Sequence, residues 1–594
     1  MLPPNKMIEL LSEHVANQIA AGEVIQRPAS AVKELLENAI DAQSTKIQLI
    51  VKDAGASLVQ VIDNGMGMSK EDAEICFKKH ATSKIKNTED LFSISSKGFR
   101  GEALSSIAAV SQVELKTKKL ESDIGHQVKI EGSQIISSEP CAFSNGTSIS
   151  MKNLFYNVPA RRNFLKSKGV ETKHIIDEFH RVALTHPEVH FTMHHNNNVI
   201  FDLPITNTRQ RIVSIFGKKY NERLVPVNEE TSITKISGFV LKPEFSKRTR
   251  GEQFLFINNR FIRNNSINHA VKVVFKDLIG SDSFPSYFIY LTVPLDTIDV
   301  NIHPSKTEIK FEDERAVYEL VKSSVRSSLS RNNIAPSIDF NPETSFDIPP
   351  LKPGESIKIP SINVNTNYNP FNKENKSQIS GNIDLLKDNF QKEFEIPENF
   401  KEQNNELPSS NLFLQFNKRY IVAAKKNGLL IIDIFRAHQQ IKFEELKQMY
   451  DNGEVLSQKL LLPIEVELNP SDFVLCMEIK EELERLGVEI DQFGKNCIVI
   501  NSFPNKSGNI NGKKFIEDCL ENIKNSNGKF ENPHDKIAWN LSKNYAHSRL
   551  IAMNSLEMAH LTDCLFSCES PLQNSKGLPI VKEINQEEII KKFS

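Results

Sequence analysis

The stretch of residues 336–408 limits what this chain of 594 residues can fold into more than any other feature. It is rich in Asn, Ser, Lys and Glu and contains nine of the 27 prolines, so it offers little apolar surface to offset the entropy cost of ordering. We therefore predict a flexible linker with a folded block on either side. Because single hydrophobic cores stop growing near about 250–300 residues, we expect three or four domains in the whole chain.

Charge and cysteine usage exclude several classes of protein. The 73 Lys and Arg residues nearly balance 75 Asp and Glu, and the net charge of −2 excludes a histone-like polycation but not a local basic surface. No run approaches the roughly 20 apolar residues that span a bilayer, and MLPPNKMIELL lacks the features of a secretory signal. We expect an intracellular protein with no membrane partner. Seven cysteines without a CxxC pair favour reduced core cysteines over metal ligands or disulfides.

A helix followed by two strands opens the first block. The segment ASAVKELLENAIDA (29–42) has high helix propensity, carries apolar side chains along one side and follows Pro28. Strands are predicted over 45–54 and 57–63, and the second runs directly into NGMG (64–67). Because the two glycines let the backbone turn sharply, a ligand can approach the main chain closely there.

Glu34 and Asn38 lie four residues apart on the predicted helix, so their side chains project from one face and can act on the same bound object. This spacing alone favours a solvated helix face. The elements that follow favour a site instead: a strand ending at Asp63, the glycine turn, a second glycine-rich segment at 98–104, and then Gly146-Thr147. Together these elements predict a nucleotide site.

Six sequence blocks resemble the GHKL, or Bergerat-fold, ATPases, and among them the MutL family of DNA mismatch-repair proteins. The blocks are ANQIAAGEVIQRPASAVKELLENAIDA (16–42), DNGMGM (63–68), KHATSKI (79–85), GFRGEALSSI (98–107), NLFYNVPARRNFL (153–165) and VNIHPSKTEIKF (300–311). The ENxxDA and DxGxG patterns are shared by GHKL relatives, whereas GFRGEAL, VPARRNFL and the HPSK lysine resemble MutL specifically.

The resemblance implies an α/β (α+β) chain of several domains. A GHKL ATPase α/β sandwich is expected over 1–220, a ribosomal-protein-like transducer domain over 221–335, and an α/β C-terminal dimerisation domain over 409–594, after the flexible linker. In the C-terminal block, FNKRYIVAAKKNGLLIIDIF predicts two strands with a turn at 426–428, and HQQIKFEELKQMY predicts a helix after them.

ATP and Mg²⁺ are the cofactors that the resemblance implies. Glu34 is similar to the family's general base, which accepts a proton from the water that attacks the γ-phosphate. Asn38 would supply an amide oxygen to Mg²⁺ without adding charge beside the phosphates. Asp63 is similar to the family's adenine reader, which accepts a hydrogen bond from the exocyclic amine; an aspartate that merely shapes a turn at the strand end is the alternative.

The other implied nucleotide contacts lie in the glycine turn, in the lid over the triphosphate, and in a loop whose free N–H groups can bind phosphate before a predicted helix. They are Gly65, Gly67, Thr82, Ser83, Lys84, Gly98, Phe99, Arg100, Gly101, Glu102, Thr147 and Lys306. Lys306 resembles the lysine that reaches the γ-phosphate from the second domain and so distinguishes triphosphate from diphosphate.

The resemblance implies a homodimeric mediator of DNA mismatch repair. ATP binding would favour association of two N-terminal blocks into a DNA clamp, and slow hydrolysis would release it. Such a clamp couples a MutS-type recognition protein to downstream nicking, unwinding and excision, in the cytoplasm beside the nucleoid. An ATP-driven chaperone, a topoisomerase subunit and a histidine kinase are the alternatives. GFRGEAL, the arginine-rich second domain and the lack of a strand-passage domain or a phospho-accepting helix pair disfavour them.

Basic side chains gather in the predicted transducer domain. Residues 242–277 contain eight Lys and Arg against three acidic residues, a net charge of +5, and residues 161–168 hold a second basic cluster. Charge alone is as typical of a solvated face as of a DNA site. The resemblance places a DNA groove here, with phosphate contacts of weak sequence specificity. The candidate DNA-binding residues are Arg161, Arg162, Lys247, Arg248, Arg250, Arg260 and Arg263.

The C-terminal block departs from the relatives that nick DNA. Their D-Q-H-A-x-x-E-x-x-x-x-E metal motif corresponds to residues 433–444, where Asp433 and Glu444 remain but Phe435 and Gln439 replace a histidine and a glutamate. Their CPHGRP-like segment corresponds to NSKGLP, which has neither cysteine nor histidine. We predict that this block dimerises and docks partners without nicking DNA. The remaining side chains that could bind a metal, with spacing unsuited to zinc, are Cys564, Cys568, His438 and His547.

The segment QKLLLP (458–463) resembles the short QxLLxP peptide with which such proteins dock onto the replication sliding clamp. Gln458, Leu461 and Pro463 are the candidate contacts. A buried strand is the equally supported alternative, because the three leucines would serve a core as well.

Overall fold

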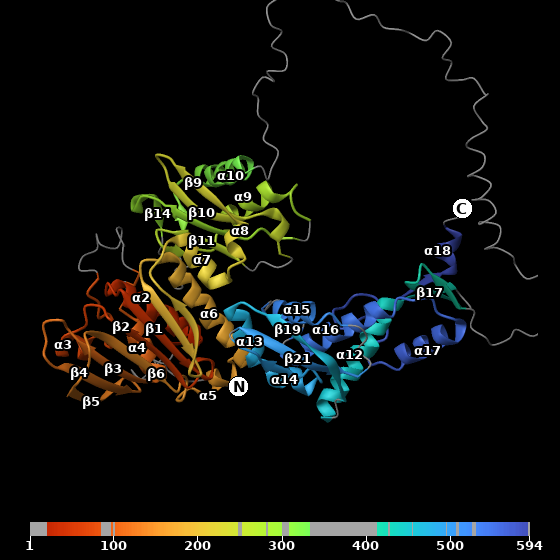
Figure 1. Cartoon of the computed structure of the whole chain (residues 1–594), viewed down its shortest axis with the longest axis horizontal. Helices are drawn as coiled ribbons and strands as arrows, with labels where there is room; N and C mark the ends of the chain where they lie inside the picture. The colour runs from red at the N-terminus through yellow and green to blue at the C-terminus, as the bar shows by residue number, and fades with distance from the viewer. Residues whose placement is uncertain are drawn as a thin grey trace, which may run out of the picture. The chain divides into compact units, whose positions relative to one another are not determined.

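Figure 1 shows the computed structural model of the chain, with the N-terminal block in red to green and the C-terminal block in cyan to blue. The structure describes residues 21–84, 97–98, 101–247, 252–280, 283–299, 308–332, 413–425, 428–453, 456–494, 496–505, 510–524, 530 and 532–591. The predicted linker over 336–408 lies outside the described residues. So do five of the candidate site residues: Phe99, Arg100, Arg248, Arg250 and Lys306.

An eight-stranded mixed sheet forms the first part of the N-terminal block, with the strand order β5-β4-β3-β6-β2-β1-β7-β8. Strands β1 and β7 pair in parallel, whereas β1 and β2, and β2 and β6, pair antiparallel. The strands are β1 (Lys46–Lys52), β2 (Leu58–Asp63), β3 (Gln112–Lys118), β4 (Gly125–Glu131), β5 (Gln134–Cys141), β6 (Gly146–Lys152), β7 (His190–His195) and β8 (Asn198–Leu203).

Helices α2 (Pro28–Asp41), α4 (Ala103–Val110) and α6 (Lys168–Thr185) share one hydrophobic core with this sheet. Pro28 occupies the first turn of α2, where a missing N–H costs nothing. Leu35 and Leu36 of this helix are buried in the core. The alternating apolar side chains of β1 are buried against them, as a half-buried strand requires. The predicted helix and the two strands after it are confirmed, with bounds shifted by one to two residues. Shorter helices of this part are α3 (Lys70–Ile75), α5 (Pro159–Asn163) and α7 (Thr208–Phe216).

A five-stranded sheet follows, in the order β12-β11-β13-β10-β9 (Figure 1). Its parallel pair, β11 and β13, is joined by the crossover helix α9, and α9 packs beside α10. The elements are α8 (Tyr220–Arg223), β9 (Leu224–Glu230), β10 (Lys235–Leu241), β11 (Gln253–Ile257), β12 (Arg260–Phe261), α9 (Asn265–Phe275), β13 (Tyr287–Thr292), β14 (Ile298–Asp299), β15 (Lys310–Phe311) and α10 (Glu314–Arg331).

Alternation along the five-stranded sheet joins it to the first part of the block. Phe254 and Phe256 on β11, with Phe288 on β13, belong to the same buried core as the eight-stranded sheet. Leu255 and Ile257 point to the opposite face, into a second core with α9 and α10. The two sheets of the N-terminal block therefore pack against one continuous aromatic core.

The C-terminal block contains two smaller sheets with separate cores. The four-stranded sheet has the order β16-β17-β18-β22, and the three-stranded sheet has the order β19-β21-β20. The strands are β16 (Phe413–Phe416), β17 (Tyr420–Lys425), β18 (Gly428–Asp433), β19 (Ser457–Glu467), β20 (Ile490–Gln492), β21 (Cys497–Pro504) and β22 (Val581–Asn585). The helices are α12 (Ile434–Asn452), α13 (Pro470–Glu478), α14 (Lys480–Arg485), α15 (Gly512–Lys524), α16 (Pro533–Ser548), α17 (Ser555–Phe566) and α18 (Gln586–Ile590).

The predicted class, a mixed α/β fold in several domains, is confirmed. The predicted strand pair and helix of the C-terminal block correspond to β17, β18 and α12. The domain boundaries stay predictions, although the change from the first sheet to the second falls between β8 and β9. Within the described ranges, no helix is long and apolar enough to cross a bilayer.

Candidate nucleotide site

The C-terminal half of α2 carries the centre of the predicted site. Glu34 and Asn38 are half-buried on the side of α2 that faces away from its buried leucines. The Lys84 ammonium donates to Asn38 Oδ1 at 3.0 Å and forms an ion pair with Asp41 Oδ2 at 2.6 Å. The structure therefore brings two of the candidate site residues, Asn38 and Lys84, into contact.

Asp41 is a member of this cluster that the sequence analysis missed. Its carboxylate accepts the backbone N–H groups of Lys97 (3.0 Å) and Gly98 (3.2 Å) in addition to the Lys84 ammonium. The signal was present, because Asp41 follows Asn38 by three residues and so lies on the same helix face. The Asp41 carboxylate thus contacts Lys84, Lys97 and Gly98 beside Asn38.

Two short loops converge on the same place. A Cβ built on Gly98 would come within 3.3 Å of the Lys84 ammonium, so the glycine leaves room above Asn38 and Lys84. Thr82 accepts the Lys84 backbone N–H at 3.2 Å, and Ser83 is exposed. The His80 N–H donates to the Gly101 carbonyl at 3.1 Å, and Glu102 immediately precedes α4. Of these candidate residues, Lys84 and Gly98 contact the end of α2, whereas Gly101 contacts the loop at His80.

Asp63 ends β2 directly opposite Thr147 on β6. Its Oδ1 atom accepts the Gly65 N–H at 2.8 Å and the Ser44 hydroxyl at 3.2 Å. Burial raises the pKa of Asp63, although these hydrogen bonds oppose the rise. A second missed residue, Thr117 on β3, bonds the buried Thr147 hydroxyl at 3.1 Å. Asp63 and Thr147, two of the candidate site residues, therefore lie in one polar patch.

Two glycines are required by the backbone around this patch. Gly67 has φ +64°, and a Cβ there would collide with the Lys118 carbonyl. Gly146 has φ +117°, and a Cβ there would collide with the Asp63 carbonyl. The Met66 N–H donates to the Ala42 carbonyl at 3.0 Å, which ties the glycine turn to the end of α2. The turn that follows Asp63 is thus tied to the end of the helix that carries Asn38.

Comparison with known proteins identifies the family of this chain. Residues 26–145 match the family described as "Histidine kinase-, DNA gyrase B-, and HSP90-like ATPase", residues 212–330 match "DNA mismatch repair protein, C-terminal domain", and residues 413–551 match "MutL C terminal dimerisation domain". The DNA mismatch repair protein MutL of Christiangramia forsetii is 44% identical over 99% of this chain and 100% of the relative. Those of Flavobacterium psychrophilum and Bacteroides fragilis are 42% and 38% identical, again over 99% of this chain.

The chain belongs to the MutL family of DNA mismatch repair proteins.

This membership joins an ATPase domain and a dimerisation domain in one mismatch repair chain. A chaperone, a topoisomerase subunit and a histidine kinase share the ATPase model, but they do not account for matches to mismatch repair families over residues 212–330 and 413–551. The match over residues 26–145 accordingly makes ATP the nucleotide of this domain.

The candidate DNA-binding residues of this MutL chain differ in accessibility. Arg162 on α5 and Arg263 after β12 are exposed. Arg161 packs its guanidinium over Gly22, where a Cβ would collide with it. Arg260 is buried, with 8% of its surface exposed. A net positive charge in a sequence window therefore does not mean that every basic side chain faces the solvent.

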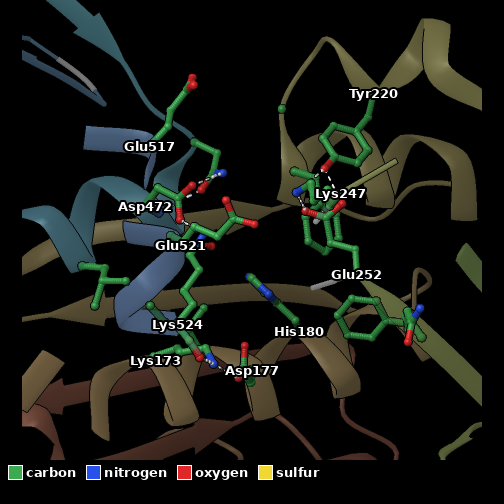
Figure 2. A pocket seen from close by; sticks show the side chains of 18 of the residues that line it. Lys173, Asp177, His180, Tyr220, Lys247, Glu252, Asp472, Glu517, Glu521 and Lys524 are labelled. Carbon is green, nitrogen blue, oxygen red and sulfur yellow. Dashed lines mark hydrogen bonds and ion pairs between the residues drawn. The ribbon is translucent and has the colours of Figure 1, made fainter. Parts of the chain in front are cut away.

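Lys247 is also engaged by neighbouring side chains. Figure 2 shows Tyr220, Lys247 and Glu252 converging: both the Lys247 ammonium and the Tyr220 hydroxyl donate to the Glu252 carboxylate. Lys247 also lies 3.5 Å from the Tyr220 hydroxyl. In this conformation Lys247 would have to leave an ion pair in order to contact a phosphate.

The remnant of the nicking motif has other structural roles. Asp433 is buried and caps α12 by accepting the Arg436 N–H at 3.1 Å, and it faces Arg419 at 3.5 Å. Glu444 accepts the Glu569 N–H at 2.9 Å. In the part of the chain that the structure describes, no group of three or more His, Cys, Asp and Glu side chains is arranged to hold a metal ion.

The other side chains considered as metal ligands differ in their surroundings: His547 is exposed, whereas His438 and Cys568 are partly shielded. Phe435 packs against His547 with ring centroids 4.7 Å apart. Burial lowers the pKa of His438 to about 4 and raises the pKa of Cys568 to about 12. Cys564 Sγ lies 3.7 Å from His560 Nε2, a residue that the sequence analysis did not consider.

The QKLLLP segment leaves the regular ladder of its sheet. Strand β19 pairs with β21, but the register shifts between Lys459 and Ile464. Leu461 and Leu462 are 101% and 82% exposed, and Gln458 and Pro463 are exposed as well. The alternative of a strand buried in the core is therefore wrong for Leu461 and Leu462.

Proposed function

We propose that this MutL chain is a homodimeric mismatch repair mediator in which ATP and Mg²⁺ close a DNA clamp and slow hydrolysis reopens it. The observation that carries the proposal is the convergence of Asn38, Lys84 and Gly98 at the end of the helix that bears Glu34. The clamp would act beside the nucleoid in the cytoplasm, between a MutS-type recognition protein and the later nicking, unwinding and excision steps.

The α2 side chains fit a Mg²⁺-dependent hydrolysis. Magnesium prefers oxygen ligands, and it would neutralise charge on the phosphates when bound at Asn38 Oδ1. That oxygen accepts a hydrogen bond from the Lys84 ammonium, which would be available to the phosphates if the amide oxygen held Mg²⁺. Glu34, one helical turn earlier, is placed to accept the proton of the attacking water. Lys306 would sense the γ-phosphate from the second domain.

Asp63 fits the role of adenine reader. A carboxylate at a strand end, held by Ser44 and the Gly65 N–H, accepts hydrogen bonds from the exocyclic amine of adenine, which guanine lacks at that position. The buried Thr147 beside it completes the polar wall.

DNA contact is proposed chiefly for Arg162 and Arg263, the exposed members of the candidate set. Arg248 and Arg250 belong to the same proposal. Contacts from such side chains go to phosphates, so binding should weaken as salt rises and depend little on sequence.

A mutation-rate measurement tests the proposed function in cells. Deletion of the gene should raise the spontaneous mutation rate, and a plasmid copy of the wild-type chain should restore it. A copy carrying Glu34→Ala should fail to restore it. An unchanged rate after deletion would contradict a role in mismatch repair.

We propose further that the C-terminal block does not nick DNA, because Asp433 serves as a helix cap and Phe435 cannot ligate a metal. Purified full-length protein with Mn²⁺ should leave supercoiled plasmid intact. Asp433→Asn is a suitable comparison, since asparagine also caps helices. Robust nicking that disappears in this variant would show that the proposal is wrong.

The exposed leucines of QKLLLP support docking onto the replication sliding clamp. We expect the Leu461→Ala, Leu462→Ala double variant to bind the sliding clamp at least about 10-fold more weakly, because exposed apolar anchors carry most of such an interface. Its fold should be unchanged, since neither side chain is in the core. The measurement is fluorescence anisotropy with the clamp of the same organism.

Leu456 provides the control for that experiment. It is 74% exposed and lies just before the QKLLLP segment, so Leu456→Ala removes a similar apolar surface outside the proposed peptide. Equal loss of affinity in the control and the double variant would contradict docking through QKLLLP.

A further inference from the structure

Lys97 connects the candidate nucleotide site to the five-stranded sheet. Its backbone N–H donates to Asp41 Oδ1 at 3.0 Å, at the end of α2. Its ammonium donates to the backbone carbonyl of Asn259, in the turn between β11 and β12. Only 9% of Lys97 is exposed. A single residue therefore bonds both domains of the N-terminal block, one through its main chain and one through its side chain.

The turn that receives Lys97 is held firmly. Asn258 and Asn259 have φ values of 47° and 63°, the left-handed conformation that asparagine tolerates in two-residue hairpin turns. The Asn258 side chain donates to the Val293 carbonyl at 2.9 Å and accepts the Val293 N–H at 3.0 Å. The Asn258 N–H also donates to Leu291 at 2.9 Å. Displacement of the Asn259 carbonyl would therefore be passed to the end of β13.

The Lys97 ammonium is shielded from water. Burial lowers its pKa to about 8, while the nearby Glu37 carboxylate on α2 opposes that change. Glu37, Arg260 and Lys97 line the same small cavity between α2, α6 and the β11–β12 turn. Hydrogen bonds from a shielded cation are stronger than those at the surface, which suits Lys97 to transmit position.

We propose that Lys97 is a positioning residue that couples the nucleotide state of α2 to the β11–β12 turn. The contact path runs from Asn38 through Lys84 and Asp41 to Lys97 and Asn259. If Asn38 Oδ1 held Mg²⁺, that oxygen would no longer accept a hydrogen bond from the Lys84 ammonium, and the Lys84–Asp41 ion pair would have to rearrange. A shift of the Asp41 carboxylate would displace the Lys97 main chain, and the Lys97 ammonium would carry that displacement to the turn. This inference rests on the proposed ATP function of the site.

Amide hydrogen exchange on the full-length protein tests the coupling. In wild type, a non-hydrolysable ATP analogue with Mg²⁺ should change the exchange rate of peptides covering β11, the turn and β12. In Lys97→Met that response should be lost, although the analogue still binds within about fivefold of wild-type affinity. Lys97→Arg should retain the response, because arginine can donate to the same carbonyl. A merely structural role would alter exchange equally with and without the analogue.

A second variant keeps the proposal open to refutation if Lys97→Met folds poorly. Asn258→Ala removes the two hydrogen bonds between the turn and Val293 and should abolish the same response. The double variant, Lys97→Met with Asn258→Ala, should behave like either single variant. If the turn of the Lys97→Met protein responds like that of wild type, the coupling is refuted and the proposed function is not affected. Failure of wild type to bind the analogue would instead refute the proposed function.

Discussion

Glu34→Ala should slow ATP turnover by at least about 100-fold while leaving ATP binding within a fewfold of wild type. General-base catalysis contributes about 10²–10⁴-fold to reaction rates, and alanine cannot accept the proton of the attacking water. The proposed binding contacts lie elsewhere: Asp63 and Thr147 form a polar patch, and Lys84 and Gly98 lie by Asn38. Phosphate release and equilibrium binding of labelled ATP, measured on the same preparations, separate the two effects.

Asn38→Ala is the matched comparison on the same helix. It removes the amide oxygen proposed for Mg²⁺, so it should weaken Mg²⁺-dependent ATP binding itself. Glu34→Ala should still allow ATP-dependent association of N-terminal blocks in crosslinking, whereas Asn38→Ala should not. Full turnover by the Glu34 variant would remove this residue as the general base.

Arg211→Met should destabilise the N-terminal block by about 3–5 kcal/mol, because several buried carbonyls would lose their donor at once. Arg211 on α7 is fully buried, and its guanidinium donates to the carbonyls of Ala183, Pro187, Val189 and Pro204 at 2.8–3.3 Å. Burial lowers the pKa of this group to about 10, so it remains charged at neutral pH. Thermal unfolding should occur on the order of 10 °C earlier.

Arg209, two residues earlier on α7, serves as the control. Its guanidinium bonds Asn221 at the surface, with Nε 3.0 Å from Asn221 Oδ1. Arg209→Met should therefore cost no more than about 1 kcal/mol. Comparable destabilisation by both substitutions would mean that the carbonyl cage around Arg211 is not what stabilises this part of the fold.

Local patterns predicted the secondary structure around the site well. The apolar spacing of α2 and the alternation in β1 and β2 specify those elements without knowledge of distant residues. The prediction for the turn named Gly65 and Gly67; Gly67 adopts a positive φ, whereas Gly65 does not, although a Cβ on Gly65 would collide with the Ala42 carbonyl. These features depend on residues near one another in sequence, which is why a single sequence contains them.

Pairings between distant residues could not be predicted in the same way. Nothing in the local sequence indicates that Lys97 meets a carbonyl 162 residues later, or that Glu252 holds Lys247. Charge counting treats Arg162 and Arg260 alike, yet one is exposed and the other is buried. Exposure of Leu461 likewise follows from a register shift in β19, which pattern alone does not specify.

The aromatic core shared by the two sheets of the N-terminal block restricts where the chain can be cut. Phe216 on α7 lies 5.8 Å from Phe254 and 5.2 Å from Phe288, measured between ring centroids, and Tyr290 donates to the Leu184 carbonyl on α6. A fragment that stops near residue 220 would leave Phe216 and its neighbours facing water. Such a fragment should aggregate, so a soluble form of the ATPase part needs to extend through α10.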